Sequence, residues 1–151
     1  MLQKLYTETR LVIADKFLIW KLLTSSSQLA NWMPNVKSIE HLGNDSLCTG
    51  SLLWVEMWAG KESEIQMWTV EDFILQGKIS FVTKIQNQKI KFTFAIENQI
   101  MNSCKITMTS ECSRDKYKLF QKKKMSNIII VSAWEYLDSL DFAITQHRKN
   151  N

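Results

Sequence analysis

The sequence predicts an α+β fold in which an antiparallel sheet of about seven strands packs against a long C-terminal helix. Apolar residues alternate with polar ones through the middle of the chain, as in half-buried strands, and recur at helical spacing near its end. Two short helical segments follow the first expected strand. Since the chain has 151 residues, 45% of them hydrophobic and 23% charged, we expect a single domain over residues 1–151.

The first third of the chain predicts a strand followed by two short helices. Residues 3–13 are rich in β-branched side chains, which favours a strand. Asp15 is suited to cap a helix, because its carboxylate can accept hydrogen bonds from free backbone N–H groups. The serines at 25–27 interrupt this helix and begin a second one over residues 28–32. Pro34 ends it, because the residue before a proline is pushed out of the helical conformation.

Residues 52–58 and 64–70 predict a hairpin around a three-residue loop. Pairing Trp58 with Glu62 keeps one face of both strands apolar. The same register places two glutamates opposite each other on the outer face, with three tryptophans beside them. These residues are Glu56 and Glu64, and Trp54, Trp58 and Trp68.

A second hairpin is expected to turn at residues 87–88, with Ile85 paired to Ile90, and a third strand follows it. Each register keeps one apolar face continuous across the sheet. A slip of one residue would turn a whole strand over, so this agreement favours an antiparallel meander. The facing pairs that result are Thr83 with Phe92, Phe81 with Phe94, Phe94 with Ile106, and Phe92 with Met108.

The last third returns to helical spacing and predicts one long amphipathic helix. Its apolar stripe needs a surface to lie on, and the apolar face of the sheet is the one available. The stripe consists of Met125, Ile129, Ala133, Tyr136, Leu137, Leu140, Ala143 and Ile144.

Residues 7–43, TETRLVIADKFLIWKLLTSSSQLANWMPNVKSIEHLG, resemble the opening of START-like proteins of the SRPBCC superfamily. In that family a strand ends at a small residue, a helix carries an aromatic residue, and a tryptophan near a proline leads into the second strand. The matching residues here are Ala14, Trp20, Trp32 and Pro34. Asp15 stands where many members carry proline, and either residue can begin a helix.

The resemblance covers essentially the whole chain. Its superfamily includes birch-pollen-allergen-like proteins and the polyketide cyclase/dehydrase and coenzyme Q-binding families. It implies the helix-grip fold, in which the sheet curls around the C-terminal helix and leaves a cavity between them. That cavity would bind or transport a small hydrophobic ligand such as a lipid, sterol, quinone or polyketide. No cofactor or metal is expected.

The sequence leaves open whether the side chains of this region enclose a pocket or fill it. The expected lining comes from the inner face of the sheet and the facing helical stripe, with Trp32 near the mouth. These ligand-binding residues are Trp32, Phe81, Phe92, Phe94, Ile106, Met108, Ile129, Ala133, Tyr136, Leu137 and Leu140.

A cyclase or dehydratase on the same fold is an alternative, and it needs an acid or base close to the substrate. The central strands offer no such group on the expected inner face, and His41 and His147 lie at the ends of elements. The outward glutamate pair is interpreted as two solvated charges. No catalytic residue is therefore assigned. The inner polar groups are those of Thr83, Cys104, Ser110, Cys112 and Tyr136.

A further alternative is a protein-interaction module that uses the hairpin of Trp54, Trp58 and Trp68. Three outward tryptophans would form an apolar patch suited to a partner or to a homodimer. The competing interpretation is that a twist or bulge turns at least one of them inward.

Basic residues concentrate between Arg114 and Lys124, in a chain whose formal net charge is +4. Lysines on one short stretch are typical of a solvated loop, so we expect no nucleic-acid partner. A transient contact of Lys122, Lys123 and Lys124 with an anionic membrane stays open.

The three cysteines, Cys48, Cys104 and Cys112, have no metal-binding spacing, which indicates free thiols in a reducing compartment. No apolar run is long enough for a signal peptide or a membrane span. The sequence therefore predicts a cytoplasmic protein.

Overall fold

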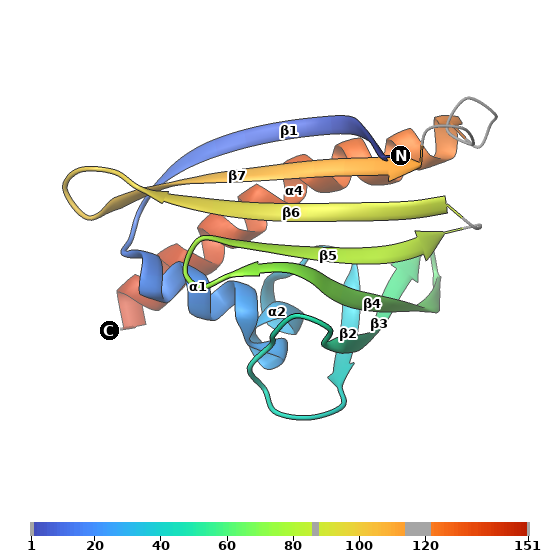
Figure 1. Cartoon of the computed structure of the whole chain (residues 1–151), viewed down its shortest axis with the longest axis horizontal. Coiled ribbons are helices and arrows are strands. Elements are labelled where there is room, and N and C mark those ends of the chain that lie inside the picture. The colour runs from blue at the N-terminus through green and yellow to red at the C-terminus, as the bar shows by residue number, and fades with distance from the viewer. Residues whose placement is uncertain (1, 86–87, 114–121, 151) are drawn as a thin grey trace.

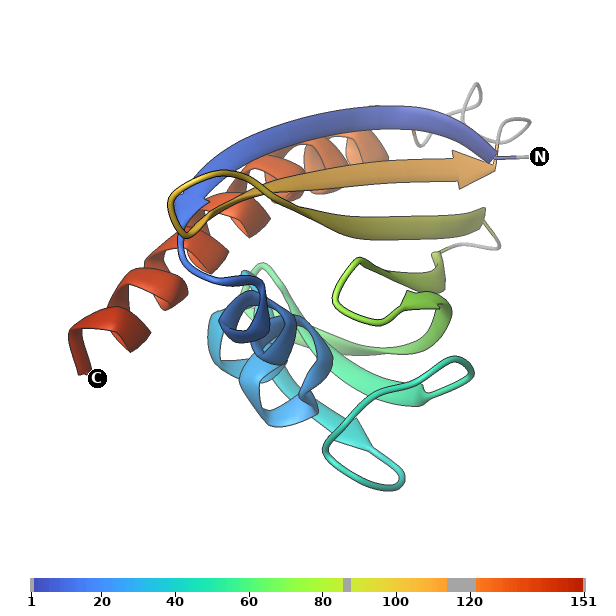
Figure 2. The ribbon, with the colours of Figure 1, turned by 60° about the vertical axis from the view of Figure 1, so that its left-hand side comes forward.

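A curved antiparallel sheet covers one long helix, α4, and two short helices, α1 and α2, lie against the C-terminal half of α4 (Figures 1 and 2). The computed structural model describes residues 2–85, 88–113 and 122–150, with the backbone alone at residues 5, 59 and 122–133. Within these residues the sheet has seven strands in the order β1-β7-β6-β5-β4-β3-β2. The predicted fold class is confirmed.

The strands and helices follow the predicted order along the chain. The strands are β1 (Leu2–Ile13), β2 (Val36–His41), β3 (Leu52–Ala59), β4 (Glu62–Ile74), β5 (Lys78–Ile85), β6 (Gln88–Asn98) and β7 (Ser103–Ser113). The helices are α1 (Lys16–Thr24), α2 (Ser26–Trp32) and α4 (Lys122–Asn150).

Short polar side chains determine where α1 and α2 begin. The Asp15 carboxylate accepts a hydrogen bond from the Leu18 backbone N–H at 3.0 Å, as the sequence predicts for the α1 cap. Ser25 caps α2, which begins two residues earlier than expected. Hydrogen bonds from Ser25 and its two serine neighbours hold the pKa of Asp45 far below its usual range and tie α2 to the loop before β3.

The β3–β4 hairpin is paired one residue away from the predicted register. Ala59 pairs with Glu62 across a two-residue turn, in which Gly60 has a positive φ of 71°. The one-residue difference exchanges the two faces of β4, so side chains predicted to lie outside lie inside. The predicted register placed three tryptophans outside and is wrong for Trp68, which is 1% exposed, whereas Trp54 and Trp58 do lie outside. The competing interpretation, that at least one of them points inward, is confirmed, and the cause is the strand register instead of a twist or bulge.

The same shift separates the two glutamates that the sequence placed opposite each other. Glu56 pairs with Ile65, and Glu64 pairs with Met57, so the two carboxylates point to opposite faces of the sheet. Glu56 accepts a hydrogen bond from the Ser63 hydroxyl, which lowers its pKa. The hairpin therefore contains no carboxylate pair.

The β5–β6 and β6–β7 pairings differ from prediction by two residues. Phe81 faces Phe92 instead of Phe94, and Phe94 faces Met108 instead of Ile106. A shift of two residues leaves every side chain on its predicted face, because the side-chain period of a strand is two. The predicted inner face is thus correct although its facing pairs are not.

Helix α4 is anchored to the edge strand β1. The Arg10 guanidinium forms ion pairs with Asp138 at 2.5 Å and Asp141 at 3.6 Å, and lies 5.2 Å from the centre of the Trp134 ring. In the described part of the chain, no helix is both long and apolar enough to cross a bilayer.

Candidate ligand site between the sheet and the last helix

The inner face of β5, β6 and β7 is an almost continuous apolar surface. Residues at every second position of these strands are buried, because one side of the sheet faces α4 and α1 while the other faces outward. The buried apolar side chains of this face are Ile79, Phe81, Ile90, Phe92, Phe94, Ile96, Ile106 and Met108.

Five rings meet at the centre of this face, and we call them the aromatic layer: Trp32, Phe81, Phe92, Phe94 and Tyr136. The Tyr136 ring centre lies 5.7 Å from that of Phe92 and 6.1 Å from that of Phe94. Phe94 also meets Phe81 at 6.4 Å and Trp32 at 6.0 Å, both edge to face. Strand, long helix and short helix thus each contribute a ring to one contact network.

The structure brings together the described members of the predicted lining. All of them are buried in one hydrophobic cluster. Those members are Trp32, Phe81, Phe92, Phe94, Ile106, Met108, Tyr136, Leu137 and Leu140. The side chains of Ile129 and Ala133 lie outside the described residues, as do those of Lys122, Lys123 and Lys124, so their predicted roles stay predictions.

One end of the inner face is polar. Thr83, Ser110 and Cys112 lie on the inner face as predicted, and Gln88 joins Thr83 at this end. The sequence analysis assigned Gln88 to a turn, yet it pairs with Ile85 as the first residue of β6. Its position two residues before Ile90, in phase with the apolar residues, was the signal that could have placed it inside.

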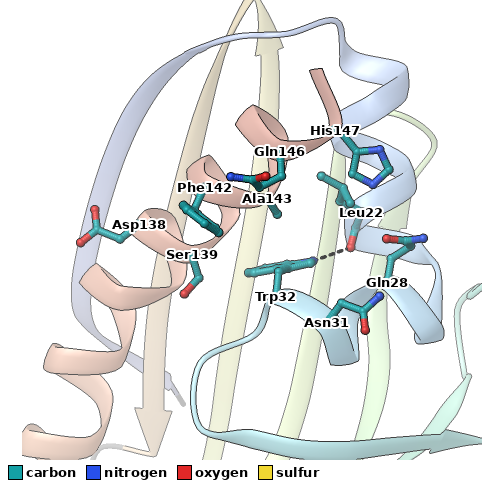
Figure 3. A pocket seen from close by; sticks show the side chains of 10 residues that line it. All are labelled: Leu22, Gln28, Asn31, Trp32, Asp138, Ser139, Phe142, Ala143, Gln146 and His147. Carbon is teal, nitrogen blue, oxygen red and sulfur yellow. Dashed lines mark hydrogen bonds between the residues drawn. The ribbon is translucent and has the colours of Figure 1, made fainter. Parts of the chain in front are cut away.

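A crevice of about 470 Å³ opens beside the aromatic layer, between α1, α2 and the C-terminal half of α4. Figure 3 shows Trp32 of α2 lying between Leu22 of α1 and the α4 residues Ser139, Phe142 and Ala143. The Trp32 indole N–H donates to the Leu22 carbonyl at 2.8 Å, which holds the ring in place. Amide and imidazole groups surround the crevice mouth, from Gln28, Asn31, Gln146 and His147.

Burial keeps the thiols of the inner face and the phenol of Tyr136 neutral. Burial raises the pKa values of the Cys104 and Cys112 thiols, which keeps them protonated and weakly nucleophilic. Burial also raises the pKa of Tyr136. Among the described residues, no three His, Cys, Asp or Glu side chains are grouped as a metal site requires.

Charged groups on the inner side occur at the edge strand β1 and are already paired. Tyr6 donates a hydrogen bond to the Glu8 carboxylate at 2.7 Å, and this bond raises the pKa of Tyr6. Arg10 is engaged by the two aspartates of α4. These edge residues were not among the predicted site residues, although Tyr6, Glu8 and Arg10 stand at alternate positions of β1.

Comparison with known proteins defines the fold. No family model matches the sequence, and no curated protein matches it either. Solved structures do match over nearly the whole chain. Ara h 8.0201 is 11% identical with a TM-score of 0.74, covering 97% of this chain and 99% of its own.

Two further structures show the same architecture. A START superfamily protein from Mycobacterium smegmatis has a TM-score of 0.73 at 15% identity, covering 95% of this chain and 99% of its own. Norcoclaurine synthase from Thalictrum flavum has a TM-score of 0.71 at 13% identity, covering 97% and 88%. The chain therefore has the same fold as these proteins, which is the helix-grip fold that the sequence predicted.

Proposed function

We propose that this protein binds a small hydrophobic molecule between the sheet and α4 and carries it without transforming it. The resemblance to START-like proteins implies a ligand cavity there. Norcoclaurine synthase, a structural neighbour, has been solved with dopamine and hydroxybenzaldehyde bound. The inner face offers such a molecule apolar side chains. Phe81, Phe94 and Met108 are fully buried, however, so a ligand must displace them, and the flexible methionine suits such a change.

The proposal rests on Trp32, which contacts both the aromatic layer and the crevice. Its ring packs edge to face on Phe94 of the aromatic layer and also lines the open crevice. A molecule that enters between Ser139 and Trp32 would meet the aromatic layer directly behind the indole. We therefore assign the crevice as the entrance and the aromatic layer as the binding surface.

Binding without turnover fits the chemistry of the site. The central inner face presents hydroxyl, amide and thiol groups, and burial keeps its thiols neutral. A cyclase needs a positioned acid or base, and the carboxylate found at the edge, Glu8, is already hydrogen-bonded to Tyr6. These contacts favour the carrier over the enzyme.

The test is a binding assay in which the crevice is filled. Nile red fluorescence would report binding to the native protein and to Ser139→Trp, whose indole would occupy the entrance. We expect the association rate to fall at least about tenfold in this variant, since the only change lies on the proposed route. The matched control is Thr145→Trp, at an exposed position of the same helix.

Two results would overturn the proposal. One is a native protein that binds no Nile red and yields no copurified apolar molecule by mass spectrometry. The other is an equal loss of binding in Ser139→Trp and Thr145→Trp while both keep the native circular dichroism spectrum.

A second candidate function, self-association, is favoured by an apolar patch on the outer face of β3 and β4. Ile65 is 66% exposed, and Trp54, Trp58 and Met67 are each more than two-fifths exposed on the same face. Such a patch suits a homodimer. Sedimentation velocity should then show a dimer that Trp54→Ser with Ile65→Ser converts to a monomer, whereas Trp134→Ser on α4 leaves the dimer intact. A monomeric native protein would exclude it.

A further inference from the structure

The inner face of the sheet has two chemically different ends. Its centre holds the aromatic layer, whereas the end next to the β5–β6 connection carries Thr83 and Gln88. Thr83 pairs with Ile90, and Gln88 pairs with Ile85, so the two polar side chains are diagonal neighbours on one face. Thr83 is 3% exposed and Gln88 is 4% exposed.

These two side chains have unused hydrogen-bonding capacity. Among the described residues, neither Thr83 Oγ1 nor Gln88 Oε1 has a hydrogen-bond partner. Further along the same face Ser110, which pairs with Phe92, donates to the Met108 sulfur at 3.6 Å within the described residues, and a thioether is a weak acceptor. Buried polar atoms are nearly always paired, because desolvation without a partner is costly. An unpaired acceptor and an unpaired hydroxyl side by side therefore point to a polar group supplied by a ligand.

The surroundings select a neutral group. In the described strands β5, β6 and β7, every inward side chain is uncharged. A carboxylate placed there would find no cation on the described inward side chains of these strands, and it could donate nothing to Gln88 Oε1. An ammonium would lack a carboxylate, since Glu8 on β1 is engaged by Tyr6. A hydroxyl both donates and accepts, so it satisfies Gln88 and Thr83 together.

We infer that the ligand is an apolar molecule with one hydroxyl group, which binds to Gln88 Oε1 and Thr83 Oγ1 while its apolar body lies along the inner face toward the aromatic layer. This inference rests on the proposed carrier function and specifies its ligand class. From Gln88 to Phe92 the strand advances about 14 Å, at roughly 3.4 Å per residue. An extended chain of about a dozen carbons covers that distance.

The test compares three probes of equal chain length: dodecan-1-ol, dodecane and dodecanoate, each supplied from the same cyclodextrin carrier and measured by displacement of Nile red. We expect the native protein to bind the alcohol about tenfold more tightly than the alkane, the value of one net hydrogen bond. The carboxylate should bind more weakly than the alcohol.

The variants Thr83→Val and Gln88→Leu remove the polar atoms and keep the side-chain volume nearly constant. In the double variant the alcohol and the alkane should bind equally, with the alkane bound at least as well as by the native protein. Thr93→Val, on the opposite face of β6, is the matched control and should keep the tenfold preference.

The outcomes separate this inference from the proposed function. If the native protein binds the alkane as tightly as the alcohol, or the carboxylate more tightly, the hydroxyl site is wrong and the carrier function stands. An alcohol preference that survives in the double variant also refutes the site. If no probe displaces Nile red and Nile red itself does not bind, both proposals fail.

Discussion

The hairpins β5–β6 and β3–β4 belong to the same sheet but differ in the polarity of their outer faces. On β5–β6 the inner face is mostly apolar and the outer face carries Lys84, Lys89, Lys91 and Thr93. On β3–β4 large apolar side chains lie on both faces: Leu53 and Trp68 inside, and Trp54 and Ile65 outside. The helices cover one side of the sheet only, so the second apolar face of β3–β4 remains in solvent.

The side chains on the two outer faces therefore make different kinds of contact. On β5–β6, Lys91 contacts Asp72 at 2.7 Å and Glu71 at 3.0 Å, where β4 departs from regular pairing. On β3–β4, exposed apolar side chains of adjacent strands face each other, as Trp54 does with Met67, beside an ion pair between Lys37 and Glu56 at 3.4 Å. The charged outer face of β5–β6 suits permanent exposure to solvent. The apolar outer face of β3–β4 suits contact with another molecule.

The largest expected effect compares two tryptophans of the β3–β4 hairpin. Trp68→Ala should lower the free energy of unfolding by about 3–5 kcal/mol, because it empties a fully buried site in contact with Phe81 and Phe92. Trp54→Ala should cost less than about 1 kcal/mol, since the Trp54 side chain is 42% exposed. Urea unfolding at low protein concentration measures both. Equal costs would mean that the outer face is also buried, and repeating the measurement at high protein concentration would detect a dimer as the cause.

A smaller effect is expected from the ionic outer face of β5–β6. Lys91→Met should lower the free energy of unfolding by about 1 kcal/mol, because it removes a partly buried cation from two carboxylates. Lys89→Met, which loses a single contact to Glu71 at 3.2 Å, should cost less.

The same ion pairs predict a pH dependence. The hydrogen bond from Lys91 lowers the pKa of Asp72 and of Glu71 in the folded state. The stability they add is therefore present above the unfolded carboxyl pKa of about 4 and is lost as the pH falls through the folded pKa. Urea unfolding at pH 7 and pH 3 should show a larger acid loss in the native protein than in Lys91→Met. An identical loss in both would refute the role of Lys91.

The smallest effect concerns the polar end of the inner face. Thr83→Val should leave the stability of the ligand-free protein unchanged or raise it by up to about 1 kcal/mol, because it replaces an unpaired buried hydroxyl with a methyl group. Thermal unfolding of Thr83→Val and of the outward control Thr93→Val would measure the difference. A clear destabilisation by Thr83→Val alone would show that the hydroxyl has a partner in the protein.

The contrast between the hairpins also explains which predictions from sequence succeeded. On β5–β6 only one set of alternate residues is apolar, so a pairing error of two residues still left Phe81, Phe92 and Phe94 on the correct face. On β3–β4 both sets are apolar, and the pattern could not choose between registers one residue apart. The predicted register therefore turned β4 over and placed Trp68 outside.

Local rules determine much of this protein from its amino-acid order alone: the Asp15 and Ser25 caps, the end of α2 near Pro34, the alternation of β5, β6 and β7, and the apolar stripe of α4. Each depends on neighbours within a few residues. Tertiary packing alone decides which face of β3–β4 is covered, which atoms surround Trp32, and that Gln88 is buried with its Oε1 unpaired among the described residues. These features depend on contacts between segments far apart in the chain, and sequence periodicity carries no information about the distances between them.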